Sequence, residues 1–304
     1  MKRMGVTYLR ILLTTRCNMS CRFCHREGVS CDGVDIDESL LLTTVGKMYD
    51  LGFRKFKLMG GEPSLYPNLT TTLAKLRKRI GDSDLSMISN GTADSIQYEK
   101  FLAAGMDRLN ISIHGWTSEF FSANTLCSID MYDKIRRTVV SLSEKRLIGK
   151  LNYVVRKGVN EHDFLELLDF AGENKLLVDA LNLLDPSGDE VIDEHRYSMQ
   201  DIERIVRSKY AVRDAFEVQN RCSLPSRILK LANGASVNLK VSKLNREMVF
   251  HACSKCTAKQ SCVEGIKAVR LTPTGIIQPC LIRTDNVLDL NHSHTDIAAY
   301  LMSL

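Results

Sequence analysis

The sequence predicts an α/β fold, an open (β/α)6 partial TIM-type barrel followed by a small C-terminal module. Six short apolar runs alternate with longer segments of helical periodicity up to about residue 210. Such alternation is typical of a parallel sheet with right-handed crossovers. Six units are too few to close an eight-stranded barrel, so we expect the sheet to stay open.

The predicted strands are short runs rich in apolar and β-branched residues. In chain order they occupy residues 8–13, 53–58, 85–88, 109–113, 151–155 and 177–184. The helical half of a unit is clearest over 161–171, where four apolar residues share one face and three acidic residues lie largely on the other. The apolar face comprises Phe164, Leu167, Leu168 and Ala171, and the acidic face comprises Glu161, Asp163 and Glu166.

After about residue 210 the pattern changes to two predicted hairpins. One spans 228–241 around Asn233-Gly234, and the other spans 268–281 around Pro273-Thr274-Gly275. We therefore divide the chain into a partial barrel over residues 1–210 and a C-terminal module over residues 211–304.

Composition excludes several classes of protein. The 304 residues carry 41 basic and 36 acidic side chains, a formal net charge of +5, without long runs of one sign, so we expect no nucleic-acid partner. No stretch approaches the roughly 18 apolar residues of a membrane span, and we expect no membrane association. Arg10 interrupts the only early apolar run, which argues against a signal peptide. The ten cysteines are therefore expected to be reduced thiols of a cytoplasmic protein.

Three of these cysteines follow the first predicted strand at the spacing Cys17-x3-Cys21-x2-Cys24. Thiolates select soft metals, and a cubane iron-sulfur cluster normally takes four cysteines. A trio therefore predicts a 4Fe-4S cluster whose fourth iron is open to a ligand from outside the protein. Structural zinc is the alternative, although zinc sites usually consist of two CxxC-like pairs.

Turns with unusual residues follow the other predicted strands. In a parallel barrel these turns meet at one mouth, where active sites lie. They are Gly60-Gly61-Glu62-Pro63, Ser89-Asn90-Gly91, His114-Gly115, Arg156-Lys157-Gly158 and Asp185-Pro186-Ser187-Gly188. Glycine and proline are common in loops of any function, but their frequency does not account for the cysteine trio after the first strand.

The cysteine trio with Phe23 before its third member, together with the Gly60–Pro63 turn, resembles the radical S-adenosylmethionine (SAM) enzymes. The resemblance implies that SAM binds the open iron and is cleaved reductively to a 5'-deoxyadenosyl radical, which abstracts hydrogen from a substrate. It also implies that seven residues bind this cofactor. They are Phe23, Gly60, Gly61, Glu62, Pro63, Ser112 and Leu184.

Nearly the whole chain resembles one subgroup, the GTP cyclase of molybdenum-cofactor biosynthesis. The similar stretches are 9–11, 24–28, 154–160, 270–272 and 279–281. The resemblance implies that Arg10, Lys57, Ser89 and Lys157 hold a nucleotide. Arg270 matches one arginine of a pair found in the cyclase, and His114 is a further candidate for substrate contact or for a structural role.

The C-terminal module departs from the cyclase pattern. Cys253-x2-Cys256 is followed by an insertion with Cys262, and Cys280 comes much later. These four thiolates are expected to ligate a second, auxiliary 4Fe-4S cluster fully. Three ligands with one unbound thiol, or a zinc knuckle, are the alternatives. Ala268 stands where the second arginine is expected, and the sequence ends without the Gly-Gly tail that the cyclase inserts into its active site.

We therefore expect a cytoplasmic radical SAM enzyme that acts on a small polar molecule, a nucleotide or another phosphorylated metabolite. Its electron donor is expected to be a flavodoxin or ferredoxin. The alternatives are an authentic GTP cyclase, a peptide-modifying radical SAM enzyme, and a noncatalytic iron-sulfur redox sensor. The sensor leaves the Gly60–Pro63 turn and Ser112 without a role.

Overall fold

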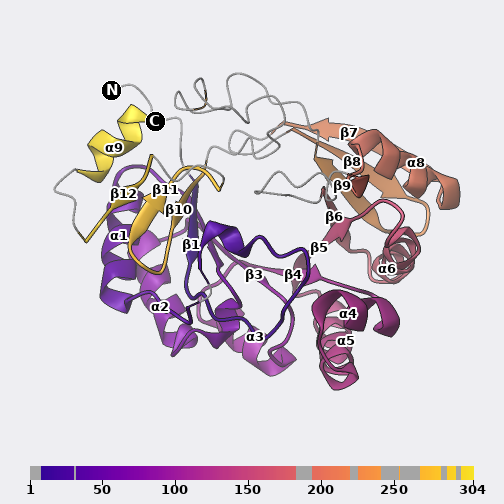
Figure 1. Ribbon diagram of the computed structural model, residues 1–304, viewed down its shortest axis with the longest axis horizontal. Helices are drawn as coiled ribbons and strands as arrows, with labels where there is room; N and C mark the ends of the chain where they lie inside the picture. The colour runs from indigo at the N-terminus through magenta and orange to yellow at the C-terminus, as the bar shows by residue number, and fades with distance from the viewer. Residues whose placement is uncertain are drawn as a thin grey trace.

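The computed structural model describes residues 8–30, 32–182, 194–219, 225–240, 253, 268–281, 286–291 and 296–304. Twelve strands within these ranges form one curved sheet (Figure 1). In spatial order they are β12 (Leu288–Asp289), β11 (Ile276–Gln278), β10 (Val269–Leu271), β1 (Tyr8–Leu12), β2 (Lys55–Met59), β3 (Asp84–Ser89), β4 (Arg108–Ile113), β5 (Ile148–Val155), β6 (Leu177–Asn182), β9 (Ser236–Lys240), β8 (Ser226–Leu231) and β7 (Val212–Val218).

Strands β1 to β6 are parallel and lie side by side in chain order, with helices between them. The helices of these units are α1 (Glu38–Asp50), α2 (Leu69–Ile80), α3 (Ser95–Ala103), α4 (Ser118–Thr125), α5 (Ile129–Glu144), α6 (Glu161–Glu173) and α8 (Met199–Lys209). The described sheet ends at β12 on one side and at β7 on the other. The predicted open, six-unit barrel is confirmed.

The predicted strands agree with the observed ones to within a few residues, and the differences have local causes. β2 begins at Lys55 rather than Phe53, because the Phe53 amide donates to the Met48 carbonyl at 3.0 Å and closes the turn after α1. β5 begins at Ile148, earlier than predicted. The last predicted run extends to residue 184, and its residues beyond Asn182 lie outside the described ranges.

Helix starts follow the expected capping chemistry. Asp37 caps α1 by accepting from the Leu40 amide at 2.8 Å, and Ser198 forms a capping box with Asp201 at the start of α8. The predicted apolar face of α6 is buried as expected, but Asp163 was wrongly assigned to its exposed side. The Asp163 carboxylate is buried because it accepts from the amides of Trp116 and Thr117 at 2.7 and 2.6 Å.

The C-terminal hairpins are confirmed, and both continue the barrel sheet. β8 and β9 are antiparallel, and β9 pairs in parallel with β6. β10 and β11 are antiparallel, and β10 pairs in parallel with β1. Residues after 210 therefore extend the sheet at both edges. The functional division of the chain at residue 210 stays a prediction.

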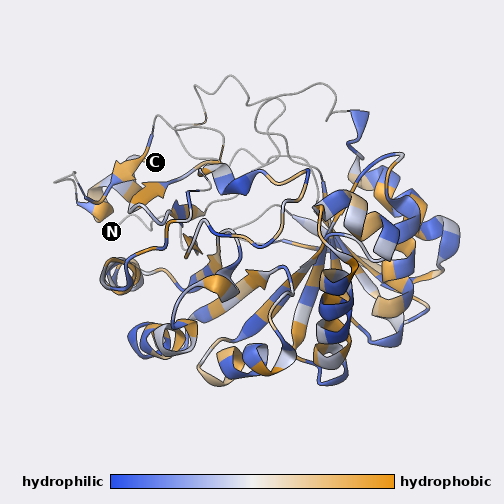
Figure 2. Cartoon of the chain, turned by 60° about the horizontal axis from the view of Figure 1, so that its bottom comes forward, coloured by the Kyte–Doolittle hydropathy of each residue, from blue (hydrophilic) through white to orange (hydrophobic). Residues whose placement is uncertain are grey.

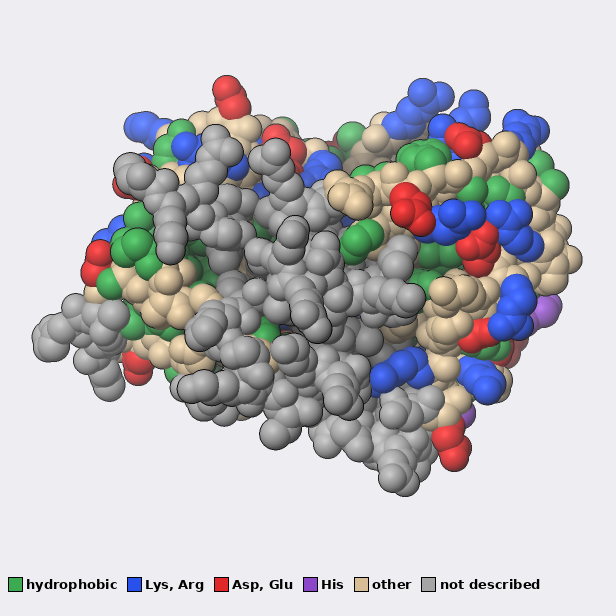
Figure 3. All heavy atoms as spheres, turned by 90° about the horizontal axis from the view of Figure 1, so that it is seen from above, with side chains coloured by type: hydrophobic (Ala, Val, Ile, Leu, Met, Phe, Trp, Pro, Cys, Tyr) green, Lys and Arg blue, Asp and Glu red, His purple; other side chains and the backbone are tan. Residues whose placement is uncertain are grey.

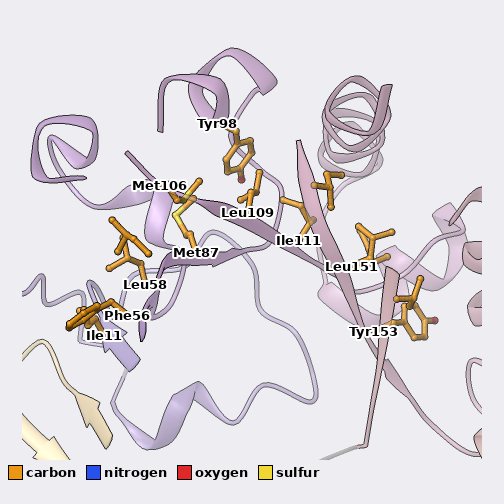
Figure 4. Close-up of a cluster of buried hydrophobic side chains, with 14 of the residues drawn as sticks. Ile11, Phe56, Leu58, Met87, Tyr98, Met106, Leu109, Ile111, Leu151 and Tyr153 are labelled. Carbon is orange, nitrogen blue, oxygen red and sulfur yellow. The ribbon is translucent and has the colours of Figure 1, made fainter. Parts of the chain in front are cut away.

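The hydrophobic core lies between the sheet and its helices. Figure 4 shows Met87, Leu109 and Ile111 of neighbouring strands on the side of the sheet that faces Tyr98 of α3. In Figure 2 the central strands carry much hydrophobic colour, whereas the helices show both hydrophobic and hydrophilic residues. Burying each such side chain contributes about 2 kcal/mol. The opposite face of the strands is thereby left for polar residues, because side chains alternate along a strand.

Charges on the described surface are mixed in sign. Figure 3 shows Lys and Arg side chains interspersed with Asp and Glu over the described part of one face. Many of them pair: on α8, Arg207 approaches Glu203 at 2.8 Å, and Lys209 approaches Asp169 of α6 at 2.7 Å. No helix in the described ranges is long and apolar enough to cross a membrane.

Candidate active site at the mouth of the barrel

The strand register gathers polar residues on the inner face of the sheet. Arg10 of β1 stands opposite Lys57 of β2 on one side and Arg270 of β10 on the other. Further along the sheet, Asp179 of β6 stands opposite Asn152 of β5 and Asn238 of β9. The inner face of the sheet therefore carries cations at one end and amides and a carboxylate at the other.

The cysteine loop crosses the mouth from the end of β1 toward α4. The amides of Ser20 and Arg22 donate to the carbonyls of Thr125 and Asn124, at 3.3 and 3.1 Å. These backbone contacts fix the loop without using a cysteine side chain. Cys17 and Cys24 are exposed, and Cys21 is half-buried.

The three thiols influence each other's ionisation. Burial, with smaller contributions from the neighbouring Cys24, Cys17 and Cys127, raises the pKa of Cys21 to about 12. Burial also raises the pKa of Cys17, with smaller contributions from Glu62 and Cys24. Thiolates that repel one another can lie together around one positively charged iron-sulfur core. Binding of that core would remove the protons of the thiols. The trio thus fits a 4Fe-4S cluster, which carries its thiolates on separate irons.

Single-ion sites have a different geometry. Within the described ranges, no three His, Cys, Asp or Glu side chains meet closely enough to hold one metal ion.

Gly60 and Gly61 allow the β2–α2 turn to press against the start of the cysteine loop. A Cβ atom at Gly61 would lie 2.0 Å from the Arg16 carbonyl oxygen, and one at Gly60, whose φ is +145°, would lie 2.3 Å from that of Thr14. The amides of Gly61 and Glu62 donate to these same two carbonyls, Thr14 and Arg16, at 2.7 Å each. The paired glycines therefore hold the cysteine loop in place by close backbone contact.

Glu62 ties the ends of two strands together. Its buried carboxylate accepts from the Ser89 hydroxyl at 2.7 Å, from the Asn90 amide at 2.7 Å and from the Ser64 amide at 3.0 Å. Burial raises the pKa of this carboxyl group, and the three hydrogen bonds oppose that rise. Pro63 is the first residue of the short helix η2 (Pro63–Leu65), where its missing amide hydrogen costs nothing.

Ser89 and Asn90 extend this network in two directions. The Ser89 hydroxyl contacts the Tyr98 hydroxyl at 2.5 Å and is buried in the floor of the site. The Asn90 side chain points the other way, donating to the Asn18 side chain at 2.9 Å and lying 3.9 Å from the Cys17 sulfur. Asn90, which the sequence placed in a turn at the mouth without a role of its own, therefore reaches the cysteine trio.

Phe23 lies between two polar groups at the far side of the mouth. Its ring centroid is 5.4 Å from that of His114 and 5.5 Å from the Arg156 guanidinium carbon. Burial lowers the pKa of His114 to about 4, so its imidazole is neutral near pH 7. A small recess beside this group is lined by Met19, Asn90, Ser112 and His114 together with residues of α5. The structure thus brings together three predicted residues, Phe23, Ser112 and His114.

The predicted phosphate-binding cations divide into two groups. Lys57 lies in the barrel, where burial and then the charges of Lys150 and Arg10 lower its pKa well below the usual range. Lys150 pairs with Asp179. Lys157 is exposed in the turn after β5, where its amide donates to the His195 carbonyl at 2.9 Å. The structure therefore groups Arg10 and Lys57 but leaves Lys157 at the rim.

Arg270 is almost fully buried, and its side chain reaches the cysteine loop. Its Nε atom lies 3.3 Å from an oxygen of Glu27, and an Arg10 nitrogen lies 3.9 Å from the same oxygen. Glu27 belongs to the left-handed turn η1 (Arg26–Gly28), three residues after Cys24. Sequence patterns did not reveal this contact because it joins residues more than 240 positions apart.

Several predicted residues are not tested by these contacts. Cys253 and Cys280 are half-buried, whereas Leu184, Cys256 and Cys262 lie outside the described residues. The second cluster therefore stays a prediction.

A model of the family described as the radical SAM superfamily matches residues 11–171. This segment runs from the end of β1 through the cysteine loop and strands β2 to β5 into α6.

Curated relatives align over almost the whole chain. A probable GTP 3',8-cyclase of Saccharolobus islandicus is 31% identical, and the alignment covers 93% of this chain and 85% of that protein. A probable GTP 3',8-cyclase of Pyrococcus horikoshii is 29% identical, with 94% and 86% covered.

Solved structures support the fold. Streptococcus suis SuiB bound to the precursor peptide SuiA superposes with a TM-score of 0.64 at 15% identity, over 97% of this chain and 62% of that chain. A structure of anSMEcpe with bound AdoMet gives a TM-score of 0.53 at 20% identity, over 66% and 59%. The chain thus spans about three fifths of these larger proteins. With a cysteine trio, a glycine-paired turn and an open barrel in one arrangement, this chain is an enzyme of the radical SAM superfamily and is related along its length to the GTP 3',8-cyclases.

Proposed function

We propose that this radical SAM enzyme abstracts hydrogen from a small anionic substrate, a nucleotide or another phosphorylated metabolite. The observation that carries the proposal is that Arg10, Lys57 and Arg270 lie on adjacent strands of the inner face, where the two arginines approach Glu27 of the cysteine loop. The guanidinium groups attract phosphates strongly in a partly enclosed barrel, and a bound anion would counteract the lowered pKa of Lys57 and favour its charged form. A peptide substrate would have less need of them.

The residues of the mouth have separable roles in this proposal. Cys17, Cys21 and Cys24 would hold the cluster, and Phe23, Ser112 and the turn Gly60–Pro63 would line SAM. When bound, the reduced cluster and SAM supply a 5'-deoxyadenosyl radical. Glu62 fixes the turn and the β3 end relative to each other, because its carboxylate bonds to both. Arg10, Lys57 and Arg270 would orient the substrate from strands β1, β2 and β10.

The proposal extends to partners and compartment. Cys253, Cys256, Cys262 and Cys280 would ligate an auxiliary 4Fe-4S cluster, and a flavodoxin or ferredoxin would supply electrons. Thiolate-held clusters require a reducing compartment, so we place the protein in the cytoplasm.

GTP cyclisation is the second candidate, favoured by the similarity to probable GTP 3',8-cyclases. One feature opposes it. Ala268 is buried immediately before β10 and two residues before Arg270, at the position where the cyclase pattern calls for a second arginine. With one cation fewer, we expect weaker binding of a triphosphate.

The test is SAM turnover. Anaerobically reconstituted protein with a strong reductant and SAM should release 5'-deoxyadenosine, and the Cys17→Ala/Cys21→Ala/Cys24→Ala variant should release none. Cys127→Ala is the matched control, since this half-buried thiol lies beside the loop but outside the trio. Turnover by the triple variant at the parent rate would refute the assigned site.

Substrate class is tested in the same assay. Release should rise with a nucleotide or sugar phosphate, and Arg10→Ala should remove that rise while leaving unstimulated turnover in place. Efficient conversion of GTP to a cyclised product, or restored molybdenum-cofactor synthesis in cells lacking their cyclase, would establish the second candidate instead.

A further inference from the structure

The arginines of the barrel already face an anion supplied by the protein. One carboxylate oxygen of Glu27, Oε2, is approached by the Arg270 Nε atom at 3.3 Å and by an Arg10 Nη1 atom at 3.9 Å. The other oxygen, Oε1, lies 4.0 Å from the His25 ring. The side chains are exposed by only 13% for Glu27, 15% for Arg10 and 1% for Arg270, so water screens their interaction weakly.

The backbone around Glu27 is built to aim this carboxylate inward. Arg26 and Glu27 both have positive φ angles, 52° and 51°, a conformation that side-chain-bearing residues adopt only when neighbouring contacts maintain it. Two contacts maintain it here: the Glu27 amide donates to His25 Nδ1 at 3.1 Å, and Gln278 of β11 donates to the Glu27 carbonyl at 3.5 Å. The turn is thus clamped between the cysteine loop and the C-terminal strands.

We propose that Glu27 is an internal counter-ion of Arg10 and Arg270. Its carboxylate then affects how tightly the barrel binds an anionic group, and how strongly that affinity depends on the charge of the ligand. The inference rests on the proposed function, in which these arginines receive the substrate's anion. A ligand phosphate must share the two guanidinium groups with the carboxylate or displace it. Because Coulomb energy is proportional to the product of the charges, Glu27 opposes a polyphosphate more than a monophosphate.

The effect has a direction that a purely structural role would not produce. Loss of a residue that only holds the turn in shape would weaken the binding of every ligand. Loss of a competing negative charge should strengthen binding, and the gain should grow with the charge of the ligand.

The experiment measures binding of inorganic phosphate, pyrophosphate and tripolyphosphate by calorimetry, with anaerobically reconstituted protein at low salt. Glu27→Gln should bind pyrophosphate roughly tenfold more tightly than wild type and tripolyphosphate more tightly still. Glu27→Asp, which keeps the charge, should stay near wild type. Absorption of the cluster in each variant shows that the cysteine loop is intact.

Glu203→Gln is the matched control. Glu203 on α8 is also a partly buried carboxylate between two arginines, 2.8 Å from Arg207 and 3.1 Å from Arg227. Its removal should leave binding of all three probes unchanged, because it lies outside the barrel.

The outcomes separate the two proposals. Suppose that Arg10→Ala binds the probes more weakly than wild type, while Glu27→Gln binds them as tightly as wild type or more weakly. The inference on Glu27 is then wrong, and the proposed substrate class stands. If Glu27→Gln binds more tightly in the charge-dependent order, yet no phosphorylated compound stimulates 5'-deoxyadenosine release, the counter-ion is correct and the substrate class is wrong. Failure of Glu27→Gln to bind any probe also overturns the inference.

Discussion

At the scale of single residues, the polar groups of the site fall into those that bind and those that hold others in place. Ser89 was predicted to contact a nucleotide, yet its hydroxyl contacts Glu62 and Tyr98 in the floor. Arg156, next to the predicted Lys157, faces Phe23 and donates to Asn124 at 2.7 Å. At the extended end of a strand, the side chains of adjacent residues point to opposite sides. A sequence pattern therefore locates a cation that faces the site only to within one position.

His114 leads to a prediction about pH. In the folded protein its pKa is lowered to about 4 by burial, against 6.5 in the unfolded chain. Since the unfolded chain then binds the proton more readily, stability is highest above pH 6.5 and falls as the pH drops toward 4. We expect His114 to lower the free energy of unfolding by on the order of 2 kcal/mol between pH 6.5 and 4.

The measurement is denaturant unfolding of wild type and His114→Asn at several pH values. Between pH 6.5 and 4, the free energy of unfolding of the variant should fall less steeply with pH than that of wild type, because the contribution of His114 is missing. His162→Asn serves as control, because the His162 side chain is 88% exposed on α6. Identical slopes for wild type and His114→Asn would contradict the assignment of a neutral buried imidazole.

At the scale of elements, local sequence predicted the strands and helices of the barrel well, because each carries its own periodicity and caps. The long-range pairings were less accessible. The short strand β10 has only three residues, and its partner β1 lies about 260 positions earlier in the chain. Nothing local encodes that partner, so the pattern predicted a hairpin but not the sheet edge that the hairpin extends.

The β2–α2 turn is an element whose glycines can be tested directly. In Gly61→Ala the new methyl group would lie 2.0 Å from the Arg16 carbonyl oxygen, a backbone atom that can move only with the cysteine loop. We expect a loss of about 2–4 kcal/mol in unfolding free energy, since overpacking adds to two lost hydrogen bonds. Iron incorporation should fall with it, as measured by absorption and iron content after reconstitution.

Gly46→Ala is the control for this change. Gly46 lies inside α1, and a Cβ atom there would meet only the guanidinium end of Arg79, which can rotate away. Alanine also favours the helix. This variant should keep wild-type stability and iron content; a comparable loss in both variants would mean that the turn has no special part in fixing the loop.

At the scale of the whole molecule, the C-terminal strands bring the two predicted cluster regions together. Turn η1, which follows Cys24, packs on the segment after β11: a Cβ atom at Gly28 would lie 3.0 Å from the Leu281 carbonyl oxygen. Cys280 immediately precedes Leu281. The sequence predicted both cysteine groups, but only the parallel pairing of β10 with β1 accounts for their approach.

The C-terminal cysteines are predicted to bind a second cluster with all four thiolates, because the insertion between Cys256 and Cys280 supplies Cys262 as a fourth ligand. In the variant lacking Cys17, Cys21 and Cys24, iron counting and Mössbauer spectra should show about four irons per chain and no iron that accepts an added ligand. Cys262→Ala in that background should open one iron, whereas Cys127→Ala should change nothing. Zinc in place of iron would contradict the prediction. A cluster unaffected by Cys262→Ala would have one iron without a protein ligand, and the base of a nucleotide whose phosphate is held by Arg10 and Arg270 could then bind it.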